Sequence, residues 1–213
     1  MVLTEQLSYV LPSPKTEGEA SVEKILANRR SRRQFRDAAM SIEQLSQILW
    51  AAYGVTNPKT PNLLRGGLRT TPSAGGLYPL EIYVAVGNVE GVEVGVYKYI
   101  SQDHTIVRTI DKDIREELGE AAFGQGSIKC APVTLVYCAI FGRTTGKYGA
   151  RGNERYVFME IGHFAQNVYL QAEALRLGAC SIGAMLDEKI CETLKPAAEE
   201  KPLCLMPVGY FYD

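Results

Sequence analysis

Four arginines fall within five residues, at positions 29 to 33, in the stretch RRSRRQF. The arginine guanidinium is a planar fork of N–H donors that matches phosphate oxygens, so several arginines around Ser31 could hold one dianionic group. The same run at the end of a helix could instead be a solvated cap whose positive charge offsets the helix dipole. Charge alone leaves both interpretations open.

We expect the arginine run to form the C-terminal end of a helix that begins after Ser21, a good N-cap residue. In a regular helix Arg29 and Arg33 lie four residues apart on one face, whereas Arg32 points elsewhere. The geometry therefore predicts that Arg29 and Arg33 can address the same anion. It also predicts that Arg32 is exposed to solvent or held in an ion pair.

A second candidate is the stretch TPSAGGLYP, residues 71 to 79, at the end of a segment from 55 to 79 that shows no convincing periodicity. Long loops of this kind inside a compact domain are often functional. Gly75 and Gly76 permit positive φ and a close approach of the backbone to a flat or charged ligand, and Ser73 adds a hydroxyl. Taken by itself, the stretch is more typical of an ordinary turn.

The stretch GRTTGKYG, residues 142 to 149, invites comparison with a phosphate-binding loop. The spacing does not fit, because only three residues separate Gly142 from Gly146, and Tyr148 stands where a magnesium-binding serine or threonine is required. No helix is expected to open at Lys147. A nucleoside-triphosphatase is therefore disfavoured, and a surface loop is one interpretation of this segment.

The histidines and cysteines do not indicate a metal site. No second ligand lies near His163 at the spacing that zinc requires. Glu160, His163 and Asn167 share one face of a predicted long helix, a pattern that more commonly marks a hydrogen-bonded histidine than a catalytic one. The five cysteines form no CxxC pair and lie mostly in apolar runs, so we expect buried thiols in a reducing compartment.

Charge and hydropathy restrict the class of protein. The 23 Lys and Arg residues are balanced by 24 Asp and Glu residues, for a formal net charge of -1, whereas nucleic-acid-binding domains usually carry a basic excess. The first residues lack both the basic start and the apolar core of a signal peptide, and no run of 18 apolar residues occurs. We therefore expect a cytoplasmic protein with no nucleic-acid or membrane partner.

The elements that must position these residues are expected to form one domain, residues 21 to 213, after an extended arm over residues 1 to 20. A capping box and helical periodicity predict a helix from Ser41 to Gly54. The other elements predicted by periodicity are strands at 80–86, 92–100, 131–141 and 203–211, and helices at 111–122, 153–178 and 187–195. This mixture, with helices ahead of the strands, indicates an α+β fold.

Four motifs, in this order, resemble the nitroreductase family of flavin enzymes, and the resemblance extends from about Ser21 to Gly209. They are RRSRRQF, PSAGGLYPLEIYV, EIGHFAQNVYLQAEALRLGACSIGAM and PLCLMPVGYF. Gly-Gly-Leu-Tyr-Pro and the stretch KYGARGNERY look most like the SagB-type branch, which includes dehydrogenases of thiazoline and oxazoline rings in modified peptides. In some of those enzymes an adjacent Lys-Tyr pair is implicated in catalysis, and Lys147-Tyr148 match it.

The resemblance implies a central mixed or antiparallel sheet flanked by helices, and a homodimer that binds FMN non-covalently at its interface, with no metal. By motif matching, the FMN phosphate and ribityl chain would contact Arg29, Arg30, Ser31 and Arg33. The flavin of the opposite subunit would be covered by Ser73, Gly75, Gly76 and Leu77. The reactive N5 edge would lie near the backbone of Ile182 and Gly183. Many family members place a further basic residue beyond the last strand, whereas none follows Lys201 here.

The implied function is that of an oxidoreductase that takes hydride from NADH or NADPH through flavin N5. It would reduce a small nitro or quinone acceptor, or run as a SagB-like dehydrogenase. Azoline oxidation would need a partner protein, because no peptide-recognition domain is evident. The alternative is a flavin-binding carrier or sensor without turnover, while a nucleic-acid or acidic-partner binder is disfavoured by the near-zero net charge.

Overall fold

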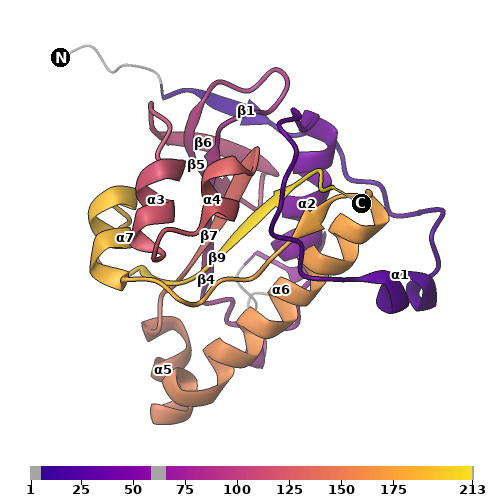
Figure 1. Ribbon diagram of the computed structural model, residues 1–213. Coiled ribbons are helices and arrows are strands. Elements are labelled where there is room, and N and C mark those ends of the chain that lie inside the picture. Colours follow the sequence, from indigo (N-terminus) through magenta and orange to yellow (C-terminus); the bar gives the residue numbers. More distant parts are fainter. Residues whose placement is uncertain (1–5, 59–65, 213) are drawn as a thin grey trace.

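The computed structural model describes residues 6–58 and 66–212 of the chain. Over these residues, seven strands form one sheet in the order β1-β6-β5-β4-β7-β9-β8, and each paired strand is antiparallel to its neighbour (Figure 1). The strands are β1 (Ser8–Val10), β4 (Leu80–Val86), β5 (Gly95–Ile100), β6 (Thr105–Ile110), β7 (Val133–Ala139), β8 (Gly178–Ala179) and β9 (Lys201–Gly209). The predicted α+β class and the antiparallel central sheet are confirmed.

Strand β4 explains how one sheet serves two cores. Successive side chains of a strand point to opposite faces, so a strand covered on both faces must be apolar almost throughout. The sequence LEIYVAV meets this condition. One core takes Leu80, Ile82, Val84 and Val86, and the other takes Tyr83 and Ala85.

Helices cover both faces of the sheet (Figure 1). One face is covered by α2 (Ile42–Tyr53) and α6 (Val157–Ala174), which pack against each other, and Phe164 is one of their buried side chains. The other face is covered by α3 (Arg115–Ala121), α4 (Gly126–Cys130) and α7 (Asp187–Leu194). Each large apolar side chain buried in this way contributes about 1.5–3 kcal/mol.

Helix α2 follows the prediction at both ends. The Ser41 hydroxyl accepts a hydrogen bond from the Gln44 N–H, and the Gln44 side chain accepts one from the Ser41 N–H. Gly54 is the C-cap residue. The predicted apolar stripe is buried, because it faces α6 and the sheet.

Two other helices differ from the prediction. Asp111 does not begin a helix, because it follows directly on β6 and the chain turns before α3 starts at Arg115. The predicted helix at 153–178 is divided into a π-helical turn, Gly152–Tyr156, and α6, which ends at Ala174. Gly178 belongs to β8, which pairs with β9.

The segment from 55 to 79 is more ordered than its sequence indicates. The short strands β2 (Val55–Asn57) and β3 (Leu68–Arg69) pair antiparallel, and residues 59–65 between them lie outside the described residues. Within the arm, β1 pairs with β6, and the Pro12 carbonyl accepts hydrogen bonds from Ser46 Oγ and the His104 side chain. Local periodicity did not reveal β1, β6 or α4, and β1 pairs with a strand that is distant in sequence.

Among the described residues, no helix is both long and apolar enough to span a membrane. The five cysteines are free thiols, three of them buried. The described part of the chain holds no group of three His, Cys, Asp or Glu side chains placed to bind a metal ion.

Candidate active site

The arginine run is extended and not helical. Helix α1 (Val22–Asn28) ends before it, and Arg29 is the C-cap residue with φ -51° and ψ 125°. Ser31 forms a parallel bridge with Ala179 of β8, and the Arg32 N–H donates to the Ala179 carbonyl at 2.9 Å. Helix α1 buries no side chain, so prolonging it would add no packing, whereas the extended chain gains partners on β8. The predicted helical face shared by Arg29 and Arg33 is therefore wrong.

The extended run is tied to α6 by Tyr169. The Arg29 guanidinium lies 5.2 Å from the centre of the Tyr169 ring, and the Ser31 hydroxyl lies 3.2 Å from the Tyr169 hydroxyl. The same Tyr169 oxygen accepts the N–H of Ser181 at 2.7 Å. One tyrosine thus brings the arginine run to the turn that contains Ile182.

The four arginines have different environments. Arg30 Nη1 donates to the carbonyls of Ala27 and Arg29, which closes the end of α1. Arg32 is half-buried and lies 4.3 Å from the centre of the Phe211 ring, so the expectation that it is exposed or ion-paired is wrong. Its side chain packs on Phe211, two residues beyond β9, and its Cβ and Cγ lie next to Gly178 of β8. Arg33 is exposed.

Within residues 6–58 and 66–212, three cations of this segment have no acidic partner. Among the residues that the structure describes, no ion pair involves Arg29, Arg30 or Arg33. Unpaired guanidinium groups beside a serine hydroxyl are a donor set that suits a phosphate. The residues present therefore fit the phosphate of FMN.

The Ile182–Gly183 turn lies beside this segment. Ile182 is buried and exchanges backbone hydrogen bonds with Leu205 of β9, whereas Gly183 is exposed and has open space where a Cβ would lie. The Ile182 pairing fixes the turn, and the exposed Gly183 leaves its backbone accessible. This arrangement suits the approach of a flat ring.

A second cluster forms around the loop at residues 73–78. A short 3-10 turn, Ala74–Gly76, contains two glycines at φ 64°, a conformation that disfavours other residues. Leu77 follows as the half-buried residue that closes the turn. The Ser73 hydroxyl accepts the N–H of Tyr78 at 2.9 Å, which holds the loop closed.

Lys147 and Tyr148 lie over this loop. The segment 142–149, expected to be irregular, forms the short helix α5 (Gly142–Tyr148) directly after β7. A Cβ placed on Gly75 would lie 2.6 Å from the Tyr148 hydroxyl and 2.8 Å from Lys147 Nζ. The structure therefore brings the Lys-Tyr pair and the glycine loop together within one chain.

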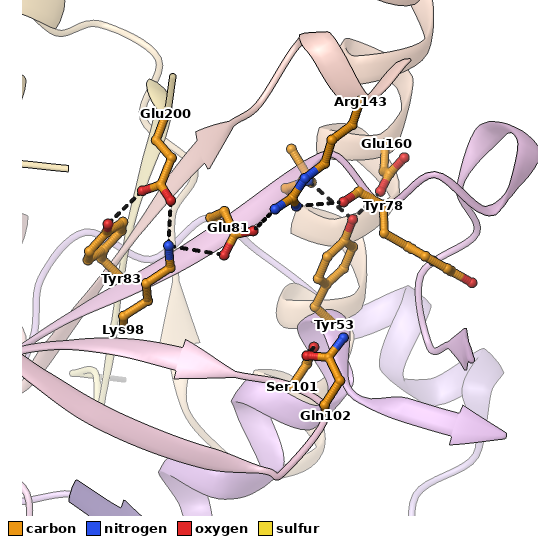
Figure 2. Close-up of polar contacts among 11 residues, drawn as sticks. Tyr53, Tyr78, Glu81, Tyr83, Lys98, Ser101, Gln102, Arg143, Glu160 and Glu200 are labelled. Atoms are coloured by element: carbon orange, nitrogen blue, oxygen red, sulfur yellow. Dashed lines mark hydrogen bonds and ion pairs between the residues drawn. The ribbon is translucent and has the colours of Figure 1, made fainter. Parts of the chain in front are cut away.

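Glu160 is the functional residue whose importance the sequence did not reveal. Its carboxylate, on α6, is only 2% exposed and accepts a hydrogen bond from Tyr53 Oη at 2.5 Å (Figure 2). It also accepts one from Ser73 Oγ at 2.6 Å. Burial raises the pKa of Glu160 to about 7, against the two hydrogen bonds that lower it. The one signal in the sequence was the polar face that Glu160 shares with His163 and Asn167 on an otherwise apolar helix. In the structure the Asn167 side chain donates a hydrogen bond to the Thr71 hydroxyl, and His163 is exposed.

The two clusters occupy different ends of α6. Glu160 marks the loop cluster and Tyr169 marks the arginine cluster, nine residues further along. At 1.5 Å per residue this places the two side chains about 13.5 Å apart along the helix axis. Within one chain, the predicted site residues therefore form two groups, one at each end of α6.

Comparisons with known proteins identify the family and the fold. The family model described as the nitroreductase family matches residues 26–210. A protein of Methanocaldococcus jannaschii that is named as a nitroreductase is 50% identical over 191 residues, which cover 90% of this chain and 91% of that protein. A crystal structure of a Ralstonia eutropha protein, also named as a nitroreductase, superimposes with a TM-score of 0.82 at 28% identity. It covers 97% of this chain and 90% of that one.

A more distant relative is the microcin B17-processing protein McbC of Escherichia coli. It is 25% identical over 189 residues, which cover 82% of this chain but only 62% of McbC. A structure of the E. coli microcin synthetase complex McbBCD shares the fold, with a TM-score of 0.72 and 24% identity over 96% of this chain and 79% of that one. With the family model matching most of its length, the chain belongs to the nitroreductase family.

Proposed function

We propose that the protein is an FMN-dependent oxidoreductase that accepts hydride from NADH or NADPH and passes electrons to a second substrate, in the cytoplasm. Members of the nitroreductase family generally use FMN and are typically dimers. The observation that carries the proposal is the arginine segment, unpaired with acids and joined through Tyr169 to the turn at Ile182.

The residues of the arginine segment and Tyr169 have separate roles in this proposal. Arg29, Ser31 and Arg33 would bind the phosphate of FMN, and Arg30 would add positive charge while holding the end of α1. Tyr169 positions both Ser31 and the Ser181–Gly183 turn. FMN, when bound, supplies the two-electron redox chemistry, and the protein orients it and tunes its charge.

The separation of the two clusters supports a homodimer. In one chain the loop cluster lies about 13.5 Å along α6 from the arginine cluster. A second copy would bring the loop of Ser73, Gly75, Gly76 and Leu77 against the flavin that the first copy holds by its arginines. The exposed Phe158 and Met159 on α6 offer apolar surface for such an association.

The second substrate is proposed to bind near Lys147 and Tyr148. Both side-chain tips lie over Gly75, where they could hold or move a proton at the substrate. Such a pair would serve a SagB-like dehydrogenase, in which the substrate replaces NADH or NADPH as the electron donor to the flavin, whereas hydride transfer to an acceptor requires no acid or base. A nitro or quinone reductase is the other option, and a non-catalytic flavin carrier or sensor is the alternative to both.

A visible spectrum tests the proposal. The purified protein is expected to be yellow, or to become yellow with added FMN, and to bleach on addition of NADH or NADPH without oxygen. A protein that takes up no FMN refutes the proposal. A yellow protein that neither nucleotide bleaches refutes the NAD(P)H-dependent reductase and leaves the SagB-like dehydrogenase and the carrier or sensor. Turnover of every accepted substrate at unchanged rate in Lys147→Ala and Tyr148→Phe would remove the Lys-Tyr pair from the mechanism.

A further inference from the structure

A polar cavity lies beside the loop cluster. It encloses about 350 Å³ where β4 begins, β5 ends and α5 begins. Side chains in its wall include Tyr53, Arg69, Glu81, Tyr99, Ser101 and Arg143. Several of them appear together in Figure 2. This volume is in the range of small-molecule sites, which are mostly apolar with a few convergent polar groups.

Arg69 is the unusual member of this wall. Its guanidinium lies against two aromatic rings, 4.4 Å from the centre of Tyr53 and 4.7 Å from that of Tyr78. Its Nε is buried without a hydrogen-bond partner, and within the described residues the Arg69 side chain makes no ion pair. Burial lowers the pKa of Arg69, although Tyr53 and Glu81 act to raise it. A desolvated cation without a counter-ion lacks the compensation that buried charges normally have.

The other charges near the cavity are already paired. Arg143 contacts Glu81 at 2.5 Å and donates to the Tyr78 carbonyl at 3.0 Å. Glu81 also faces Lys98 at 3.3 Å, and Lys98 continues to Glu200, as Figure 2 shows. Arg69 takes part in none of these ion pairs.

Glu160 is not the counter-ion of Arg69 either. Its two carboxylate oxygens are taken by Tyr53 and Ser73. Arg69 acts on Glu160 only as a charge that lowers the Glu160 pKa. Arg69 therefore keeps one positive charge that no described side chain neutralises by contact.

We infer that this cavity is a subsite for an organic carboxylate monoanion, with Arg69 as its counter-ion. A carboxylate can accept two parallel N–H bonds from a guanidinium fork. A phosphate dianion would add a second negative charge close to Glu81, with no further unpaired cation to meet it. The flanking tyrosines and the Leu80 and Ile82 side chains give the apolar walls that the carbon skeleton of such a ligand requires.

The subsite is close enough to the proposed active site to serve the same substrate. Gly75 lies under Lys147, and Tyr78, which stacks on Arg69, follows three residues later, so their Cα atoms are at most about 11 Å apart. Arg143 and Lys147 are also one turn apart on α5 and share a face. This link to the active site rests on the proposed function, and it requires that the second substrate carry a carboxylate.

The test measures binding directly and does not depend on turnover. Calorimetric titration of the purified protein with benzoate is expected to show binding, with inorganic phosphate binding more weakly. Arg69→Met should weaken benzoate binding about 10- to 100-fold, the range for loss of a charge-assisted bond. Arg155→Gln is the matched control, because this arginine is exposed and outside the cavity, and should leave binding unchanged.

Two further variants guard against a folding defect. Arg69→Lys keeps the charge and loses the fork, so it should bind benzoate with intermediate affinity. Ser101→Leu fills the cavity with Arg69 intact and should also weaken benzoate. Equal benzoate affinity in wild type and Arg69→Met would overturn the subsite, as would phosphate binding that is as tight as that of benzoate and is lost in Arg69→Met.

The same samples separate the two proposals. FMN uptake and bleaching by NADH are recorded by visible spectrum before the titration. Binding that depends on Arg69 in a protein that does not bleach keeps the subsite and refutes the NAD(P)H-dependent oxidoreductase. A protein that bleaches but binds benzoate independently of Arg69 keeps the oxidoreductase and refutes the subsite.

Discussion

The two ends of α6 hold polar groups in opposite ways. At the Tyr169 end, Arg29 and Arg33 lie at or near the surface without an acid partner, and their positions are set by backbone pairing with β8. At the Glu160 end, a carboxyl is buried and held by two hydroxyl groups. Water solvates an exposed cation at little cost until a ligand replaces it, whereas a buried carboxylate needs partners within the fold. The first end is suited to binding and the second to fixing a loop.

The largest expected effect is on the pH dependence of stability and comes from Glu160, at the buried end of α6. The folded-state pKa of Glu160, about 7, lies above its ordinary value of 4.5, so the folded protein holds this proton more tightly. The stabilisation is complete below pH 4.5 and is lost as the pH rises to about 7, a difference of about 3 kcal/mol. Chemical denaturation of wild type and Glu160→Gln across this range measures it.

Glu160→Gln mimics the protonated carboxyl, so its stability should lack this component of the pH dependence. The difference between the two proteins removes the contribution of other titrating groups. A constant difference from pH 4.5 to 7.5 would show that Glu160 does not titrate there, and the contrast between the two ends would lose its main support.

The next largest effect is on FMN affinity and comes from the exposed arginine segment. Arg33→Ala should weaken FMN binding about 10- to 100-fold, because a charge-assisted hydrogen bond contributes about 1.5–3 kcal/mol. Fluorescence titration of the apoprotein with FMN measures this. Arg36→Ala, which removes another exposed arginine three residues along the chain, is the control and should bind FMN as wild type does. Equal affinities in all three proteins would remove Arg33 from the phosphate site.

A smaller effect tests the contact between the glycine loop and α5. Gly75→Ala introduces strain at φ 64° of about 1–2 kcal/mol, and its Cβ would push Lys147 and Tyr148 away. Gly91→Ala carries similar strain at φ 74° with nothing within 4 Å of its Cβ, so it is a matched control. Both variants should lose similar stability by thermal denaturation, but only Gly75→Ala should slow turnover. A comparable slowing in Gly91→Ala would contradict the proposed role.

The smallest effect separates Arg32 from its neighbours. Arg32→Ala removes the guanidinium from the Phe211 ring and should lower the free energy of unfolding by about 0.5–1 kcal/mol. FMN affinity should stay at the wild-type value, because the guanidinium packs on the Phe211 ring. The two measurements are urea denaturation and FMN titration of the same preparation. A loss of affinity as large as that of Arg33→Ala would place Arg32 in the ligand site.

Much of the fold was predictable because it depends on local patterns. The strand at 80–86 and the helix after Ser41 appear with the predicted bounds, since alternation and a capping box act within a few residues. The ordered motifs also gave the family, which the comparisons confirm. The sites at Arg29, Gly75 and Ile182 stay predictions, although the structure places them in two coherent clusters.

The rest depends on residues that are distant in the sequence. The arginine run reads as a helix end, but Ala179 supplies the pairing that makes it extended. Glu160 reads as one polar position on an apolar helix until Tyr53 and Ser73 are seen to enclose it. No local pattern encodes such partners, because their positions follow from the packing of several elements.

The sequence by itself determined the secondary-structure class, the family and the residue types that could bind a flavin phosphate. Only the tertiary structure decided that the arginines lie along β8 and that Lys147 and Tyr148 lie over Gly75. It also decided that Arg69 lies against two tyrosine rings without a counter-ion among the described residues. The physical reason is that helix and strand preferences act over a few residues, whereas burial and charge pairing depend on the whole packed chain.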